Sequence, residues 1–206
     1  LERARLQDFS LRGKIGRELS QCTVGVIGTG AIGATVIRHL SGFGCRILAY
    51  DKFPNEAVKQ YATYVDGPTF AREADIITLH CPLTPETRHI LNEETLPYLK
   101  DGVFIVNTSR GVLLDTAKTI HFLKSGKIGL LAIDVYEEEA DYFYRDLSDK
   151  VPTNDELARL LTFPNVLVTS HMAFLTDHAL RNIAEITLGN FAEFERTGQC
   201  SNQITE

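Results

Sequence analysis

The sequence predicts an α/β fold: a doubly wound parallel sheet of six to seven strands with helices on both faces. Short apolar runs rich in β-branched residues alternate along the chain with segments of helical pattern. The runs are almost continuously apolar, which is typical of parallel strands covered on both sides. No internal repeat, low-complexity tract or long linker interrupts the alternation. We therefore expect right-handed crossovers, and ligands bound beyond the carboxyl ends of the strands.

The elements follow from these runs in chain order. The expected strands are residues 23–28, 46–50, 74–80, 102–109, 130–135 and 165–171, and residues 63–66 would make a seventh. Helical patterns follow the six longer strands, at residues 31–44, 55–62, 92–100, 115–126, 154–161 and 177–195.

Composition excludes several classes of function. The 206 residues are 44% apolar and 23% charged, as in an ordinary globular protein, and the net charge of -6 favours neither nucleic acid nor an anionic membrane as a partner. No apolar run approaches the roughly 20 residues of a membrane span. The four cysteines are widely separated and form no C-x-x-C pair. We therefore expect free thiols, no metal site and a cytoplasmic location.

A glycine-rich turn follows the first strand and opens the first helix. In "GVIGTGAIG", Gly28 permits a tight turn, Gly30 lets the backbone approach a pyrophosphate, and Gly33 allows close packing of helix on strand. Asp51 ends the second strand, about 20 residues later, where a carboxylate can accept from both ribose hydroxyls. Together these features predict a dinucleotide site. The carboxylate favours NAD over NADP, and Lys52 makes that preference less strict.

Other polar side chains near strand ends are ambiguous when each is taken alone. His171 ends the run "NVLVTSH", yet most histidines serve structure. Arg110 follows a strand and suits a carboxylate ligand, but an arginine in such a loop is as often a surface residue. Glu137, Glu138 and Glu139 also follow a strand. Since a run of three acids is usually solvated, at most one is expected to be functional.

Five motifs occur in one order: "VGVIGTGAIG…AYD", "LHCPLTPET", "VNTSRGVLLD", "IDVYEEEADYFYRD" and "NVLVTSHMAFLT". From about Asp8 to the end, the chain resembles the D-isomer-specific 2-hydroxyacid dehydrogenases, most closely their fermentative D-lactate dehydrogenase branch. The resemblance implies a Rossmann fold and hydride transfer between NADH and the 2-oxo carbon of pyruvate or a close relative.

The resemblance assigns three catalytic residues. Arg110 would hold the substrate carboxylate and polarise the ketone. His171 would be the acid and base, supported by Glu139, which leaves Glu137 and Glu138 as solvated neighbours. Unlike many relatives, this chain has serine before the histidine and methionine after it.

The resemblance also assigns a cofactor shell. Asp134 would face the nicotinamide carboxamide. The wall on the adenosine side would be formed by His80, Cys81, Pro82 and Thr84. His39, His89, His121 and His178 match no family site and are taken as ordinary. The expected cofactor-binding residues are Gly28, Thr29, Gly30, Ala31, Ile32, Gly33, Asp51, His80, Cys81, Pro82, Thr84, Thr108, Ser109, Asp134 and His171.

The expected NAD-binding domain is residues 13–183. Residues 1–12 would be a lead-in that crosses between domains, and residues 184–206 a helix and tail that return toward a substrate domain. Family members build most of that domain from an N-terminal segment that this sequence lacks, so we expect the isolated chain to turn over little. Apolar residues at helical spacing in the last helix predict a face that is exposed, rebuilt or covered by a second copy. A homodimer through the NAD-binding domain is expected.

Two alternatives remain open at this point. One is a D-2-hydroxyacid dehydrogenase for a larger substrate. The other is an NAD-responsive binding protein, because the resembled family includes transcriptional corepressors. The presence of Arg110, Glu139 and His171 together favours an enzyme.

Overall fold

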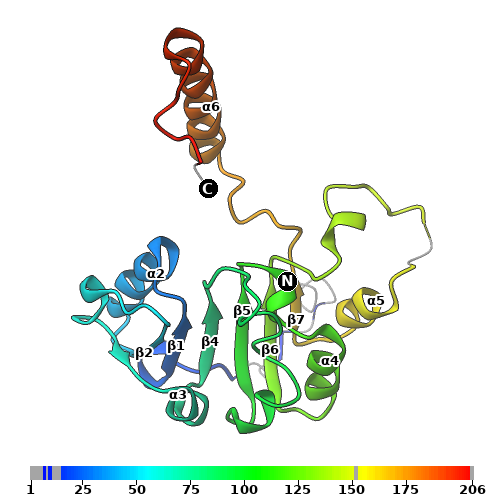
Figure 1. Ribbon diagram of the computed structural model, residues 1–206. Coiled ribbons are helices and arrows are strands. Elements are labelled where there is room, and N and C mark those ends of the chain that lie inside the picture. Colours follow the sequence, from blue (N-terminus) through cyan, green and yellow to red (C-terminus); the bar gives the residue numbers. More distant parts are fainter. Residues whose placement is uncertain (1–6, 8, 11–14, 151–152, 205–206) are drawn as a thin grey trace. The chain divides into compact units, whose positions relative to one another are not determined.

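A seven-stranded parallel sheet organises the first of two compact units, which runs from residue 1 to Thr169 (Figure 1). The computed structural model describes residues 7, 9–10, 15–150 and 153–204. The strand order β3-β2-β1-β4-β5-β6-β7 confirms the predicted fold class. The strands are β1 (Thr23–Ile27), β2 (Arg46–Tyr50), β3 (Thr63–Tyr64), β4 (Ile76–Leu79), β5 (Val103–Asn107), β6 (Ile128–Ile133) and β7 (Val166–Val168).

The strand order reverses between β1 and β4. The chain runs outward from β1 through β2 to β3, then returns to β4 on the other side of β1. At this switch point, backbone hydrogen bonds continue past the strands: the Gly28 N–H donates to the Tyr50 carbonyl at 2.9 Å, and the His80 N–H donates to the Ile27 carbonyl at 2.7 Å. Ligands of doubly wound sheets bind at such a crevice.

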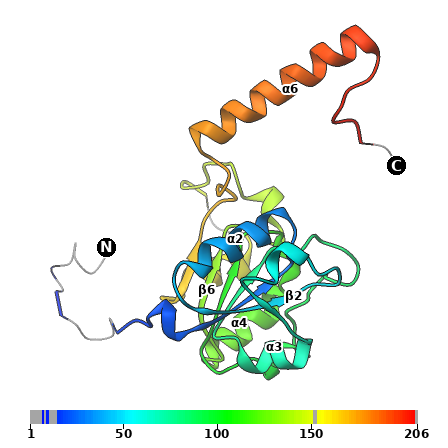
Figure 2. The ribbon, with the colours of Figure 1, turned by 90° about the vertical axis from the view of Figure 1, so that its left-hand side faces the viewer.

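Helices cover both faces of the sheet, as Figure 2 shows for α2 on one side and α3 and α4 on the other. Side chains alternate along β1, so Val24 and Val26 pack in a cluster with Ile37 of α2, whereas Ile27 joins a larger cluster with Phe70 of α3. The larger cluster also contains apolar residues of α4 and α5. The helices are α2 (Ala31–Ser41), α3 (Gly67–Glu73), α4 (Thr116–Lys124) and α5 (Asp155–Leu161).

Two of the expected helices are much shorter than their patterns. Residues 55–62 form only the 3₁₀ turn η2 (Glu56–Val58), because eight residues are marginal for a helix and the chain must enter β3 at once. Residues 92–100 form only η3 (Leu96–Tyr98), where Pro97 lacks the N–H that a helix interior needs. The remaining 3₁₀ turns are η1 (Leu19–Gln21), η4 (Gly111–Leu113) and η5 (Glu139–Asp141).

Helix α3 was not expected from the sequence. Its signals are local: the Asp66 side chain accepts from the Thr69 N–H at 2.7 Å, and a proline lies in the first turn. A segment of seven residues is too short to show a clear helical period, which explains the omission.

The second unit runs from Ser170 to residue 206 and contains helix α6 (Asp177–Thr197). Thr176 caps its start by accepting from the Ala179 N–H at 3.1 Å. None of its residues is buried. The expected domain boundary at 183/184 falls inside this continuous helix, whereas the compact units divide between Thr169 and Ser170. The expected lead-in, residues 1–12, lies outside the described residues except for positions 7, 9 and 10.

No helix among the described residues is long and apolar enough to cross a bilayer.

Candidate active site

The glycine turn is shaped by close backbone contacts. Gly28 has φ +92°, and a Cβ there would lie 2.4 Å from the Cys81 nitrogen. A Cβ on Gly33 would lie 1.9 Å from the Gly28 carbonyl oxygen. These two glycines are therefore required by the protein's own packing.

Gly30 differs, because no protein atom lies within 4 Å of a Cβ built on it. It caps α2 without a side-chain hydrogen bond, and the next residues, Ala31 and Ile32, are exposed. The helix therefore presents unpaired N–H groups and the positive end of its dipole to open space. This cradle fits a pyrophosphate.

Asp51 lies beside the cradle and is tied to it. Its Oδ2 accepts from the Thr29 N–H at 2.5 Å and from the Thr29 hydroxyl at 2.9 Å, and its Oδ1 accepts from the Phe53 N–H at 2.8 Å. Burial alone would raise the pKa of Asp51, but these hydrogen bonds outweigh it and lower the pKa. A carboxylate held in its charged form next to the turn suits a ribose diol.

Two residues of this network were not predicted. The Tyr64 hydroxyl donates to the Thr29 hydroxyl at 2.8 Å and accepts from the Asn55 N–H at 2.8 Å. The Asn55 side chain donates to the Thr29 carbonyl at 3.1 Å. Thr29 is far from both in the sequence. The pairing of β3 with β2 brings Tyr64 to the turn, and Asn55 lies in the loop that follows β2.

The segment after β4 forms the other wall of the crevice. His80 Nε2 lies 2.9 Å from the Thr78 hydroxyl, and burial lowers the pKa of His80. Burial raises the pKa of the Cys81 thiol, and its carbonyl accepts from the Ser109 hydroxyl at 2.7 Å. The Pro82 carbonyl accepts from the Thr87 hydroxyl, which also closes a turn on Thr84. None of these groups is set up as an acid or nucleophile.

Arg110 lies in a turn that buried Asn107 holds. The Asn107 side chain donates to the Arg110 carbonyl at 2.8 Å and accepts from the Ser109 N–H at 3.0 Å. Thr108 and Arg110 are exposed. A Cβ on Gly111 would lie 2.0 Å from the Tyr136 carbonyl carbon, so this turn packs on the backbone that leads to the glutamates. The backbone of Arg110 is therefore fixed near that loop, and the Arg110 guanidinium donates to the Ser109 carbonyl at 2.7 Å.

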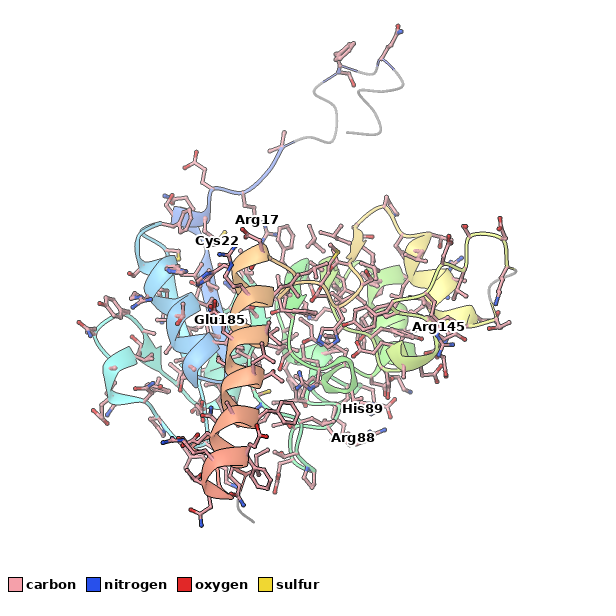
Figure 3. All side chains as sticks on the ribbon, turned by 90° about the horizontal axis from the view of Figure 1, so that it is seen from above. Arg17, Cys22, Arg88, His89, Arg145 and Glu185 are labelled. Atoms are coloured by element: carbon pink, nitrogen blue, oxygen red, sulfur yellow. The ribbon has the colours of Figure 1, made fainter. Side chains whose placement is uncertain are left out.

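Glu137 is not the solvated neighbour that the sequence predicted. Its side chain is only 23% exposed; Oε1 lies 2.7 Å from His89 Nε2, and Oε2 accepts from the Thr116 hydroxyl at 3.2 Å. Arg88 Nη2 lies 3.8 Å from Glu137 Oε1, and Figure 3 shows Arg88 and His89 next to each other. His89 is thus not an ordinary surface residue, and its φ of 50° is uncommon for a side chain of this size.

The other two glutamates, Glu138 and Glu139, have different hydrogen-bond partners. Glu138 is exposed and accepts from the Asn154 side chain at 2.6 Å. Glu139 is half-buried, and its Oε2 accepts from the Tyr136 N–H at 2.9 Å. Asn154 also accepts from the Tyr136 hydroxyl at 3.0 Å, and burial raises the pKa of Tyr136 to about 12. Each of the three neighbouring glutamates therefore has its own hydrogen-bond partners.

Asp134 and His171 follow the last two strands. Asp134 is 5% exposed and accepts from the Thr169 hydroxyl. His171 belongs to the second unit, lies three residues after β7, and has a left-handed backbone with φ 53°. Such strain in a residue other than glycine concentrates at functional sites. The described residues contain no group of three His, Cys, Asp or Glu side chains placed to hold a metal ion.

Residues 2–173 match the sequence family described as D-isomer specific 2-hydroxyacid dehydrogenase, NAD binding domain. The chain belongs to this family. It is 48% identical over 204 residues to the D-lactate dehydrogenase of Escherichia coli K12 and to an aromatic 2-oxoacid reductase of Clostridium sporogenes, covering 98% of this chain and 62% of each relative. A D-lactate dehydrogenase solved with NAD⁺ from Lactobacillus jensenii matches with a TM-score of 0.89 at 32% identity, covering 100% of this chain and 62% of that one.

Membership in the D-2-hydroxyacid dehydrogenases makes the first unit an NAD-binding domain, and the open cradle at Gly30 fits that cofactor. The chain spans 62% of the length of the relatives named above.

Proposed function

We propose that this protein interconverts a 2-oxo acid and the corresponding D-2-hydroxy acid, with pyruvate and D-lactate as the pair. The observation that carries the proposal is spatial. The phosphate cradle, Asp51 and the fixed turn of Arg110 follow the carboxyl ends of β1, β2 and β5, three parallel strands of the sheet in the NAD-binding domain. Cofactor binding and carboxylate recognition are therefore available at one edge of the sheet.

NADH, when bound, supplies a hydride to the 2-oxo carbon. Arg110 is proposed to hold the substrate carboxylate through two parallel hydrogen bonds, as a guanidinium does well. It cannot release its proton at neutral pH, so another group must neutralise the oxygen that gains charge. We assign that role to His171, which donates a proton during reduction and accepts one during oxidation. Glu139 is the carboxylate that favours the charged imidazole.

Larger substrates are the second candidate. An aromatic 2-oxoacid reductase is as similar to this chain as the D-lactate dehydrogenase of Escherichia coli, at 48% identity each. The ratio of kcat/KM for pyruvate and for phenylpyruvate separates the two, and a higher value for phenylpyruvate would overturn the lactate assignment.

The test of the mechanism is NADH oxidation by the full-length protein with pyruvate. His171→Gln should lower turnover by about 10²- to 10⁴-fold, the usual contribution of a positioned acid, while NADH should still bind. In the unmodified enzyme, reduction should fall and lactate oxidation should rise as the pH increases, because only a protonated donor serves reduction. Near-normal turnover by the variant would refute the role of His171.

We also propose a cytoplasmic location and a homodimer formed through the NAD-binding domain. The four cysteines are free thiols, which agrees with a reducing compartment. Self-association through α6 of the second unit is a separate proposal, which the large apolar side chains exposed along that helix support.

A further inference from the structure

We propose that Tyr64 is a positioning residue that sets the preference for NAD over NADP. It would act through Thr29 and Asp51 without contacting the cofactor itself. The inference rests on the proposed binding of the adenosine ribose by Asp51. It goes further by naming the side chains that fix the carboxylate.

The hydrogens in this network can be placed in only one order. The Tyr64 hydroxyl accepts from the Asn55 N–H at 2.8 Å, and its own single hydrogen points to the Thr29 hydroxyl, also at 2.8 Å. The Thr29 hydroxyl, having accepted this bond, directs its single hydrogen to Asp51 Oδ2 at 2.9 Å. The tyrosine therefore orients the threonine as a donor to the carboxylate.

As a result, one oxygen of the Asp51 carboxylate is already hydrogen-bonded within the protein. Two donors from Thr29 fill the acceptor sites of Oδ2, whereas Oδ1, which accepts from the Phe53 N–H, keeps acceptor capacity for the ribose hydroxyls. A carboxylate held this way cannot swing aside. It therefore stands against the negative charge of a 2′-phosphate, and the repulsion excludes NADP.

Tyr64 is suited to this role by its place in the fold. It belongs to β3, a two-residue strand at the edge of the sheet that pairs only with β2. Because the Tyr64 hydroxyl reaches Thr29 in the glycine turn, this short edge strand is fastened to the start of α2 through a side chain. Removing the hydroxyl would free the Thr29 hydroxyl to rotate while the ring could stay in place.

The experiment titrates NADH and NADPH into the chain by calorimetry. Tyr64→Phe should lower the affinity for NADH by about 2- to 10-fold, the range expected for one hydrogen bond. It should also bring the NADH and NADPH affinities closer together. Tyr61→Phe is the matched control: Tyr61 lies three residues away, is 40% exposed, and should change neither affinity.

A double-mutant cycle tests the route through Thr29. Thr29→Val should bring the NADH and NADPH affinities closer together, as Tyr64→Phe does. The double variant should have the same affinities as Thr29→Val alone, because both substitutions remove the same chain of hydrogen bonds. Thr29→Ser keeps the hydroxyl and should retain more of the difference between the NADH and NADPH affinities than Thr29→Val does. If Tyr64→Phe did not fold, an unchanged difference between the NADH and NADPH affinities in Thr29→Val would still overturn the inference, because Tyr64 is proposed to act through that hydroxyl.

The outcomes separate this inference from the proposed function. If Tyr64→Phe lowered the NADH and NADPH affinities equally, Tyr64 would have a purely structural role and the inference would be wrong. It would also be wrong if Tyr64→Phe changed neither affinity, or if the effects of Tyr64→Phe and Thr29→Val were additive in the double variant. An unmodified chain that failed to prefer NADH would instead overturn the assignment of Asp51 to the ribose, and this inference with it.

Discussion

At the residue scale, the three glycines of the turn have different functions. A Cβ on Gly33 would meet a backbone oxygen at 1.9 Å, so Gly33→Ala should destabilise the fold and the cofactor site together. A Cβ on Gly30 would meet no protein atom, and its φ of -65° suits alanine. Gly30→Ala should therefore lower the free energy of unfolding by no more than about 1 kcal/mol, because alanine is a poorer N-cap than glycine. It should weaken the binding of NADH, because the methyl group stands where the phosphate approaches.

Urea unfolding and NADH titration of both glycine variants test this difference. A Gly30→Ala chain with normal NADH affinity would show that the cofactor does not approach the turn as proposed.

His80 predicts a dependence of stability on pH. Burial lowers its pKa in the fold, whereas an unfolded histidine titrates near 6.5. As the pH falls through about 6.5 toward the folded pKa, the unfolded chain binds more protons and stability is lost. His80→Gln should remove this contribution, so the urea midpoint should fall less between about pH 7 and pH 5. His121→Gln, at an exposed position of α4, should leave the decline unchanged.

Whether the sequence could predict the role of a single residue depended on how far along the chain its partners lie. The glycines and Asp51 follow strands directly, so their position at the carboxyl edge was predictable. Tyr64 was missed because its function depends on the pairing of a two-residue edge strand. Glu137 was misjudged because its partners, His89 and Thr116, come from two other segments. Membership of a run of acids says nothing about such contacts.

At the element scale, α3 depends on one aromatic side chain. Phe70 is 4% exposed, and its ring would meet a Cβ on Gly25 at 2.4 Å, so the ring occupies the space that this glycine leaves on β1. Phe70→Ala should lower the free energy of unfolding by about 3–5 kcal/mol through the cavity it creates. Phe43→Ala, with a ring 60% exposed, is the control and should cost about 0.5 kcal/mol or less. A similar small loss for both would contradict the packing of α3.

Strands were more predictable than helices in this chain. The run "RILAY" has the observed bounds of β2, because a continuous apolar run is a local property. The segments at residues 55–62 and 92–100 carry helix-forming residues, but a proline and the need to reach the next strand limit each to one turn. The missed helix α3 has only its cap and proline as signals.

At the scale of the whole molecule, the sequence predicted the strand alternation and thus the doubly wound sheet. The division into compact units after Thr169 is a separate property of the contacts, and the predicted domain ranges stay a prediction. Contacts that define a boundary are long-range. The periodicity of α6 continues across residue 183 because the helix is one element. The boundary instead follows β7, where the chain leaves the sheet after Thr169.

The apolar face of α6 leads to the last prediction, which concerns association. Ile183, Leu188 and Phe191 recur at helical spacing and are 52%, 68% and 70% exposed. We expect the unmodified chain to self-associate through this face, since contiguous apolar surface of this kind marks protein interfaces. Replacing all three with serine should abolish the association through α6, which sedimentation velocity would show as a smaller species; a dimer formed through the NAD-binding domain would remain. The urea midpoint of the sheet should not change, because none of the three side chains is buried. Glu185→Ser combined with Arg196→Ser, a charge-neutral change on the same helix, should leave the association intact. A chain that is monomeric without any substitution, or a serine variant whose sheet unfolds earlier, would contradict association through this face.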